Sequence, residues 1–237
     1  MLAMVLGIIP RFTMSCTLKI IDLGSMEYEE ALLLQRTIHK EAVEGRELQD
    51  SSLFNLLLLE HFPPVITLSK RPAASENLIA TPQQVKNAGV SICKTDRGGD
   101  ITYHGPGQLV GYPIFDLNVL SLRLHSYMRF LEGCIIDVLD RFGIAGSRDK
   151  KATGVWVDGA KICAMGVRVS KWISMHGFAL NVSTNLDHFD LIVPCGLTGR
   201  SVTSMQQLLG NSCPSMDEVK KVVSDVFTQS VYEESNK

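Results

Sequence analysis

Cys195 is the residue of this sequence that is best suited by its surroundings to act as a nucleophile. It lies between Pro194 and Gly196, and backbone of this composition presents a side chain on a constrained but accessible turn. A cysteine thiol, with an ordinary pKa of about 8.5, is only a few per cent ionised at neutral pH. A nucleophilic Cys195 therefore needs a cation or a base beside it.

Three residues elsewhere in the chain are candidates for that cation or base. Lys161 begins an apolar segment typical of a strand, and the strand period of two predicts Lys161, Cys163 and Met165 on one face. A lysine at the start of a strand is more often a solvated surface residue. His104 and His176 are the other candidates, so a cysteine–histidine pair like that of some proteases stays open.

A glycine-rich segment could form part of a binding site. Residues 98–111 contain five of the 19 glycines, which allow backbone N–H groups to approach a ligand closely. Arg97 and His104 lie in the same segment and could contact polar atoms of that ligand. Neither GxxxxGK[ST] nor GxGxxG is present, so a nucleotide phosphate is not indicated. A glycine-rich hairpin with a salt-bridged Arg97 explains the same pattern.

The surrounding pattern predicts the strands and helices that must position these segments. Strands are expected at residues 18–23, 53–59, 65–68, 90–94, 109–115, 155–157, 161–167 and 178–182. Helices are expected after N-caps at Ser25, Thr81 and Ser215, the last with a capping box to Glu218, and over residues 124–142. Strands and helices mix without strict βαβ alternation, which favours a single α+β or mixed α/β domain on a mixed sheet.

The composition is that of an ordinary globular protein. Of 237 residues, 45% are hydrophobic and 20% charged, and the net charge is −2, so no overall basic field would attract nucleic acid or a membrane surface. We expect one catalytic domain over residues 17–237. Residues 1–16 are interpreted as an N-terminal extension: its apolar beginning is either a buried first strand or, as we favour, a few residues upstream of the true start at Met14.

The cysteine spacing excludes some kinds of site. The six cysteines stand at positions 16, 93, 134, 163, 195 and 213 without a CxxC pair, so we expect no structural zinc site and no disulfide framework. Unpaired thiols suit a reducing compartment. No stretch approaches the length of a membrane span. These features predict a soluble, cytoplasmic protein that binds no metal.

Three segments together resemble one enzyme family, the lipoyl(octanoyl) transferases or lipoate-protein octanoyltransferases. They are RGGDITYHGPGQ at residues 97–108, KICAMG at 161–166 with HGFALNV at 176–182, and PCG at 194–196. The resemblance extends from residue 20 to about residue 210. It implies the fold shared by biotin and lipoate protein ligases.

The resemblance also implies a reaction without a cofactor. An octanoyl group would pass from acyl carrier protein to Cys195 as a thioester, and then to a lysine of a lipoyl domain. The acceptors would be the E2 subunits of 2-oxoacid dehydrogenases and the glycine cleavage H protein. Lys161 corresponds to the lysine that lowers the pKa of the thiol and acts as general acid and base, so that Cys195 and Lys161 form the catalytic dyad.

The same resemblance implies an acyl pocket built from two parts of the chain. Its substrate-binding residues would be Arg97, Gly98, Gly99, Asp100, Ile101, Thr102, Tyr103, His104, Ala164, Met165, Gly166, Gly177, Phe178 and Ala179. Small and apolar side chains suit a medium-length acyl chain, and glycines let backbone N–H groups face a thioester oxyanion.

Three other functions are compatible with these residues. An ATP-dependent lipoate-protein ligase would need an adenylate site and would not need Cys195. An acyl thioesterase would form the same acyl-enzyme and pass the acyl group to water. A non-catalytic module that binds carrier or lipoyl domains would use neither Cys195 nor Lys161.

Overall fold

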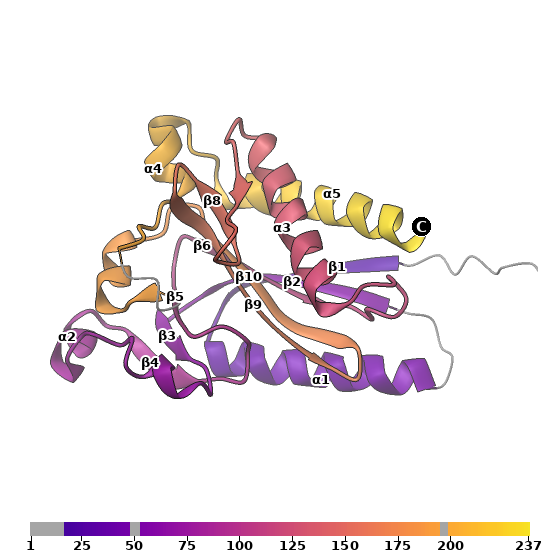
Figure 1. Ribbon diagram of the computed structural model, residues 1–237, viewed down its shortest axis with the longest axis horizontal. Coiled ribbons are helices and arrows are strands. Elements are labelled where there is room, and N and C mark those ends of the chain that lie inside the picture. The colour runs from indigo at the N-terminus through magenta and orange to yellow at the C-terminus, as the bar shows by residue number, and fades with distance from the viewer. Residues whose placement is uncertain (1–16, 48–52, 195–198) are drawn as a thin grey trace, which may run out of the picture.

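The computed structural model describes residues 17–47, 53–194 and 199–237, and two β-sheets organise them (Figure 1). The larger sheet has the strand order β1 (Thr17–Met26), β2 (Leu53–His61), β6 (Gln108–Ile114), β10 (Ile173–Asn181), β9 (Ala160–Ser170), β8 (Val155–Val157), β7 (Ser147–Arg148). The smaller sheet has the order β4 (Ser91–Lys94), β3 (Val65–Leu68), β5 (Ile101–His104). The predicted extension, residues 1–16, lies outside the described residues.

Both sheets are mixed, as the sequence predicts. In the larger sheet β1 runs parallel to β2, and every other neighbouring pair is antiparallel. In the smaller sheet β3 is parallel to β4 and antiparallel to β5. The mixed α/β fold class is therefore confirmed.

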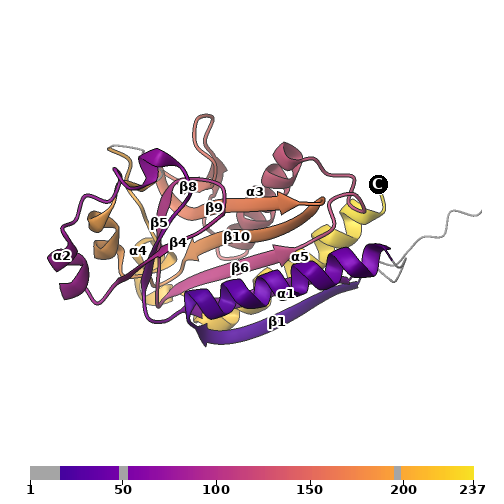
Figure 2. The same cartoon turned by 90° about the horizontal axis from the view of Figure 1, so that it is seen from below.

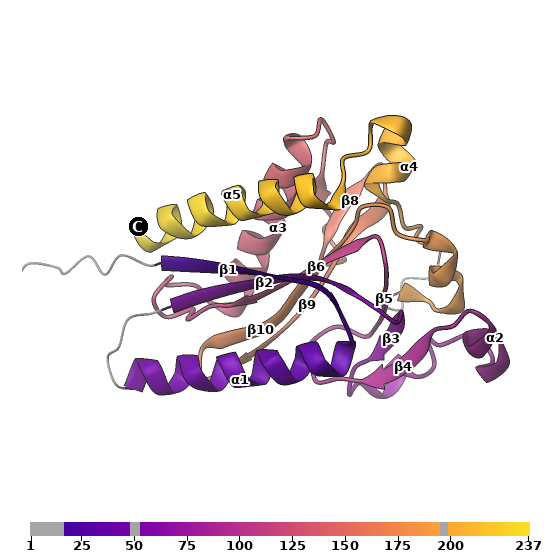
Figure 3. The same cartoon turned by 180° about the vertical axis from the view of Figure 1, so that it is seen from behind.

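Helices cover both faces of the larger sheet. They are α1 (Tyr28–Glu47), α2 (Pro82–Asn87), α3 (Leu124–Asp140), α4 (Met205–Leu209) and α5 (Met216–Ser235), with short 3₁₀ turns η1 (Pro72–Ala74), η2 (Leu186–Leu191) and η4 (Gly210–Ser212). Helix α1 lies on one face, and α3 and α5 pack together on the other (Figures 1 and 3). The smaller sheet and α2 lie at one end (Figure 2). Across the described ranges, no helix combines the length and the apolar character of a membrane span.

Burial on both faces explains why the sequence of strand β2 is continuously apolar. Leu56 and Leu58 belong to the core beneath α3 and α5, whereas Leu57 and Leu59 belong to the core beneath α1. A strand that is buried on both faces has no polar face to alternate with. The apolar run thus reports a central strand covered by helices on both sides.

Two of the three predicted N-caps are confirmed, and one is wrong. Thr81 and Ser215 each form a capping box, with Gln84 and Glu218 respectively. Ser25 does not cap α1, because β1 continues to Met26 in register with β2 and the helix begins at Tyr28. Strand pairing across the sheet outweighs the local capping tendency of a serine.

The β9–β10 hairpin is longer than the sequence predicts. Its strands continue to Ser170 and from Ile173, and the two turn residues Lys171 and Trp172 have φ values of 49° and 63°. Glycine or asparagine usually adopts this left-handed backbone in a hairpin. Lys171 and Trp172 are neither, so the residue types do not predict a turn here. The predicted turn at residues 158–159, which joins β8 to β9, is confirmed.

The close contact between Gly177 of β10 and the backbone of β6 can be tested by substitution. A Cβ atom added at Gly177 would lie 2.3 Å from the Gly111 carbonyl oxygen and 2.5 Å from Cδ of Pro113. We expect Gly177→Ala to lower the free energy of unfolding in urea by about 1–3 kcal/mol, because rigid backbone must move.

Gly45→Ala is the matched control. Gly45 lies in α1 with no atom within 4 Å of an added Cβ, so alanine should raise stability by up to about 1 kcal/mol. Equal stability of the two variants would contradict the close approach of β10 to β6.

Candidate active site

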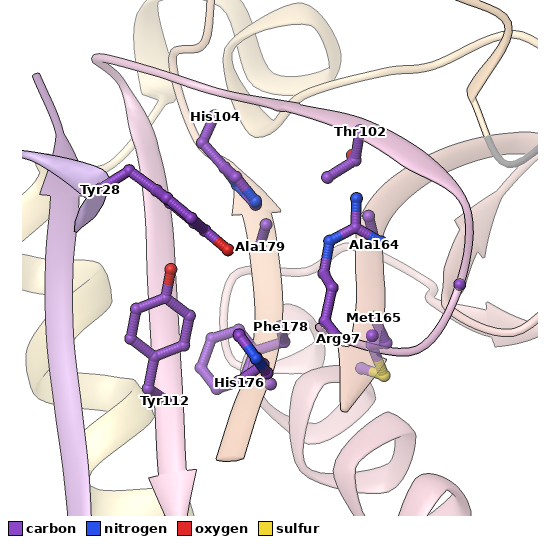
Figure 4. A pocket seen from close by; sticks show the side chains of 13 residues that line it. Tyr28, Arg97, Thr102, His104, Tyr112, Ala164, Met165, His176, Phe178 and Ala179 are labelled. Atoms are coloured by element: carbon purple, nitrogen blue, oxygen red, sulfur yellow. The ribbon is translucent and has the colours of Figure 1, made fainter. Parts of the chain in front are cut away.

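A pocket opens where the smaller sheet meets β9, β10 and the start of α1 (Figure 4). It is lined by Tyr28, Arg97, Gly99, Thr102, His104, Tyr112, Ala164, Met165, Gly166, His176, Gly177, Phe178 and Ala179.

The floor of the pocket is made of small residues that face each other across two strands. Ala164 of β9 pairs with Ala179 of β10, and Gly166 pairs with Gly177. A Cβ atom at Gly166 would lie only 2.6 Å from the Gly98 carbonyl oxygen. Small side chains here leave space above the sheet and let the glycine-rich segment approach it.

Arg97 reaches over that floor in a fixed orientation. Its guanidinium donates hydrogen bonds to the Thr67 carbonyl oxygen at 2.8 Å, to Thr67 Oγ1 at 2.9 Å and to the Gly98 carbonyl oxygen at 3.0 Å. The Gly98 N–H donates to the Val167 carbonyl oxygen at 2.9 Å, which holds this segment on β9. Arg97 is therefore a positioned cation in the pocket wall (Figure 4).

Aromatic and imidazole rings form the opposite wall, where Tyr28, His104 and Tyr112 point into the pocket (Figure 4). His61 stands behind them, with Nδ1 3.0 Å from the Met26 carbonyl oxygen and Nε2 2.7 Å from the Tyr112 hydroxyl. A carbonyl oxygen can only accept, so Nδ1 donates and Nε2 accepts from the Tyr112 hydroxyl. His61 thereby fixes the orientation of Tyr112.

A chain of buried hydrogen bonds connects this wall to the strand that carries Lys161. His104 Nδ1 donates to Gln108 Oε1 at 2.8 Å, and Gln108 Nε2 donates to Asn181 Oδ1 at 2.9 Å. Asn181 Nδ2 donates to the Thr203 carbonyl oxygen at 3.0 Å, and the Thr203 N–H donates to the Lys161 carbonyl oxygen at 3.0 Å. A fully satisfied buried network of this kind makes its members rigid.

Burial keeps the ring groups of the wall uncharged. Desolvation lowers the pKa of His61 to about 4 and that of His104 well below its ordinary value. Desolvation also raises the pKa of Tyr28, and that of Tyr112 well above its usual range. These groups are neutral around pH 7, so this wall offers hydrogen bonds without net charge.

His176 has a carboxylate behind it. Its Nε2 lies 3.1 Å from Asp96 Oδ1, and Arg168 donates to Asp96 Oδ2 at 2.5 Å. Desolvation lowers the pKa of His176 to about 4 against the opposing effect of Asp96. Desolvation would raise the pKa of Asp96, but the hydrogen bond from His176 and the charge of Arg168 hold it below its ordinary value. The arrangement orients His176 without charging it.

Lys161 is buried at the start of β9, with 5% of its surface exposed. The strand period predicted for it is wrong, because β9 bulges against β8: Trp156 pairs with Lys161, but Val155 pairs with Cys163. The extra residue breaks the alternation of side chains, so Lys161 and Cys163 do not share a face. Cys163 packs in the main core, where burial raises the pKa of its thiol.

The predicted nucleophile, Cys195, lies outside the described residues together with Gly196. The chain on its C-terminal side runs beside Lys161, where the Lys161 N–H donates to the Ser201 carbonyl oxygen at 2.9 Å and Val202 forms a parallel bridge with Lys161. A second, open depression includes Pro194 and Gly199, which flank the gap. The geometry of a Cys195–Lys161 pair therefore stays a prediction.

Ten of the fourteen predicted substrate-binding residues line the pocket. Gly98, Asp100, Ile101 and Tyr103 do not. Ile101 and Tyr103 alternate with Thr102 and His104 along β5 and pack into the core beneath the smaller sheet. Asp100 instead accepts a hydrogen bond of 2.8 Å from Asn77. A strand presents only every second side chain to one side. A contiguous sequence motif does not show which of its side chains face the pocket.

Three lining residues were not predicted as substrate-binding: Tyr28, Tyr112 and His176. Tyr28 begins α1 and Tyr112 lies in a central strand, where an aromatic side chain suggests only core packing. The sequence indicates His176 only as a candidate partner of the thiol. Nothing local in the sequence distinguishes these positions, because the tertiary structure brings them to the pocket.

Solved structures with a similar arrangement define the class of fold. The chain matches a lipoate protein ligase from Thermoplasma acidophilum with a TM-score of 0.69 and 17% identity, covering 91% of this chain and 84% of that one. It matches the biotin protein ligase of Aquifex aeolicus with a TM-score of 0.56 and 13% identity, covering 92% and 72%. The predicted fold of biotin and lipoate protein ligases is confirmed.

Sequence comparison identifies the family within that class. The model of the lipoyl protein ligase A/B catalytic domain matches residues 26–228. An octanoyltransferase of Caldicellulosiruptor saccharolyticus is 49% identical over 207 residues, which covers 86% of this chain and 85% of that protein. The chain belongs to the lipoyl protein ligase A/B catalytic domain family and, within it, to the octanoyltransferases, which are acyltransferases.

The buried histidines predict a loss of stability in acid. Because the pKa of His61 falls from its ordinary 6.5 to about 4 on folding, its contribution is complete above about pH 6.5 and is lost as the pH falls toward about 4. Between these values it should lower the free energy of unfolding by up to about 1.4 kcal/mol per pH unit.

His61→Gln should flatten the pH dependence of urea unfolding, since an amide keeps both hydrogen bonds but does not titrate. The exposed His125 is the matched position, and His125→Gln should leave the slope unchanged. An unaltered slope in His61→Gln would contradict a neutral, buried His61.

Proposed function

We propose that this protein transfers an octanoyl group from octanoyl-acyl carrier protein to a lysine of lipoyl domains, the first step of endogenous protein lipoylation. The acceptors are the lipoyl domains of 2-oxoacid dehydrogenase E2 subunits and the glycine cleavage H protein. The observation that carries the proposal is the small-residue pocket beside the strand of Lys161, in a chain whose relatives are named octanoyltransferases.

The pocket suits an aliphatic chain held by apolar contact. Ala164, Ala179 and Phe178 supply apolar surface, and burial of a methylene group contributes about 0.8 kcal/mol. An octanoyl chain would therefore gain several kcal/mol of binding free energy without a charged anchor. The neutral hydrogen-bonding wall is compatible with the uncharged carbonyl of a thioester.

In the first half-reaction the Cys195 thiolate attacks the carbonyl carbon of the octanoyl thioester. A carbon–sulfur bond to Cys195 forms, and the bond to the carrier's sulfur breaks. The Lys161 ammonium gives its proton to the leaving carrier thiolate. Backbone N–H groups of the glycine-rich segment are candidates to stabilise the oxyanion that develops on the carbonyl oxygen.

In the second half-reaction the acceptor lysine attacks the acyl-enzyme. The neutral Lys161 amine accepts the proton that the attacking amine loses, an amide bond forms, and Cys195 leaves as a thiolate. Lys161 thus returns to its ammonium form, and one residue serves both steps. Because the thioester supplies the energy of the transfer, the reaction needs neither ATP nor a bound cofactor, and we place it in the cytoplasm.

Intact-protein mass spectrometry tests this mechanism. Mixing the protein with octanoyl-acyl carrier protein should add one octanoyl group, and a lipoyl domain should then receive it without ATP. Cys195→Ser should abolish a hydroxylamine-sensitive thioester adduct. Lys161→Ala should slow its formation on the order of a hundredfold or more, as expected for loss of a general acid.

Each other outcome identifies a different function. Transfer that requires ATP would indicate a lipoate ligase, and release of octanoate without an acceptor would indicate a thioesterase. An unmodified protein that still binds either partner would indicate a binding module, and the covalent mechanism would then be abandoned.

Substitution of Ala164 should shorten the preferred acyl chain. Ala164 lines the pocket and is partly exposed, so leucine there would fill space that the chain needs. Each excluded methylene should lower kcat/KM about fourfold, and octanoyl transfer on the order of 50-fold in total. Butanoyl transfer should change little.

Ala164→Ser is the size-matched control and should keep the octanoyl preference. Steady-state kinetics with carrier proteins loaded with four-, six- and eight-carbon chains measure both variants. Equal losses of kcat/KM for every chain length in Ala164→Leu would show that this pocket does not bind the acyl chain.

A further inference from the structure

Residues of β8 and of the loop before it lie against the side chain of Lys161. Its Nζ is 4.8 Å from the centroid of the Trp156 ring. Gly154 lies against its methylene groups, since an added Cβ there would be 3.4 Å from Lys161 Cε and 2.5 Å from the Cys163 carbonyl oxygen. The Cys163 carbonyl oxygen and a φ of 123° therefore require glycine at 154, which in turn lies in contact with the lysine.

Hydrogen bonds hold this wall in place. Trp156 Nε1 donates to the Ala152 carbonyl oxygen at 3.1 Å, and the Ala152 N–H donates to Asp149 Oδ1 at 3.0 Å. The Gly154 N–H donates at 3.0 Å to Glu132, a fully buried carboxylate on α3. The orientation of the Trp156 ring is thus set by its own loop and by α3, independently of Lys161.

Trp156 also contacts the chain that follows residue 198. The Arg200 guanidinium carbon is 4.4 Å from the ring centroid, and Arg200 donates to Asp149 Oδ2 at 2.5 Å. The Lys161 N–H donates to the Ser201 carbonyl oxygen, and the Thr203 N–H donates to the Lys161 carbonyl oxygen. One ring therefore contacts the side chain of Lys161 and the segment that runs beside it.

Core packing alone does not account for Trp156. Its neighbours Val155 and Val157 belong to the main hydrophobic core, and alternation along a strand directs Trp156 to the other side. There it is 2% exposed and faces two cations. The face of an indole ring attracts an ammonium group most strongly where water is excluded, and it does so without occupying an N–H donor.

We propose that Trp156 is a positioning residue for Lys161, which holds the ammonium group of the lysine in place for proton transfer. This inference rests on the proposed acid–base function of Lys161. Trp156 itself does not touch the acyl group; it acts through the lysine and through Arg200. Tryptophan and phenylalanine share the aromatic face that the role requires, whereas leucine offers similar apolar packing without it.

Kinetics of octanoyl transfer by Trp156→Phe and Trp156→Leu separate a positioning role from a packing role. Trp156→Leu should lower kcat on the order of tenfold, with KM for both protein substrates within about twofold, since no substrate contact is lost. Trp156→Phe should recover most of that loss. Equal kcat values in the two variants at equal thermal stability would overturn the proposal.

A spectroscopic test needs no activity. The sequence has two tryptophans, so Trp172→Phe in the exposed β9–β10 turn leaves Trp156 as the only fluorophore of this kind. In that background Lys161→Met should shift the Trp156 emission maximum, because the nearby charge is removed, whereas Lys150→Met on the surface should not.

The two tests distinguish the proposals from each other. An emission shift in a protein that transfers no octanoyl group would contradict the proposed function but support the contact between Trp156 and Lys161. An unchanged emission, in a protein that does transfer octanoyl groups, would overturn the positioning role alone.

Discussion

The small residues that pair across β9 and β10 are the constraint on which the pocket depends. The pairs Gly166–Gly177 and Ala164–Ala179 lie at the centre of the larger sheet, where most positions carry bulky apolar side chains. The hydrogen-bonded ladder continues through them, so the sheet keeps its rigidity while the space above it stays open. The glycine-rich segment can then rest on β9 through Gly98. The pocket exists because glycine and alanine leave space at positions that larger side chains fill elsewhere in the sheet.

The polar groups around this space are buried, and the structure satisfies them without charge. His61 is held between a carbonyl oxygen and the Tyr112 hydroxyl, and His104 is held by Gln108. Because desolvation favours the neutral imidazole, these rings stay uncharged around pH 7. The charged groups stand apart from this wall: Arg97 is fixed by Thr67, and Lys161 lies against Trp156. The ring wall of the pocket is therefore neutral, and the charged side chains lie on other segments.

Much of the fold was predictable because local patterns and the final structure agree. The capping boxes at Thr81 and Ser215 and the turn at residues 158–159 depend on neighbouring residues alone, and all three are confirmed. Both errors arose where pairing between strands decided the outcome. Ser25 remains in a strand because it pairs with Glu60 of β2, and the period of β9 is broken by a bulge against β8, its neighbour in the same hairpin. Strand pairing outweighs the local preference at both positions.

The sequence by itself determined the family and the mixed α/β class, because glycine, lysine and cysteine occur in three segments in an order that the family's motifs share. It also predicted most of the pocket floor, since small residues leave a visible pattern. Only the tertiary structure decided which side chains of those segments face the pocket. Ile101 and Tyr103 pack in the core instead of facing the pocket. Tyr28, Tyr112 and His176 line the pocket although they were not predicted to bind substrate. The physical reason is that a side chain's direction depends on register and on packing against elements far away in the chain, and no local pattern encodes either.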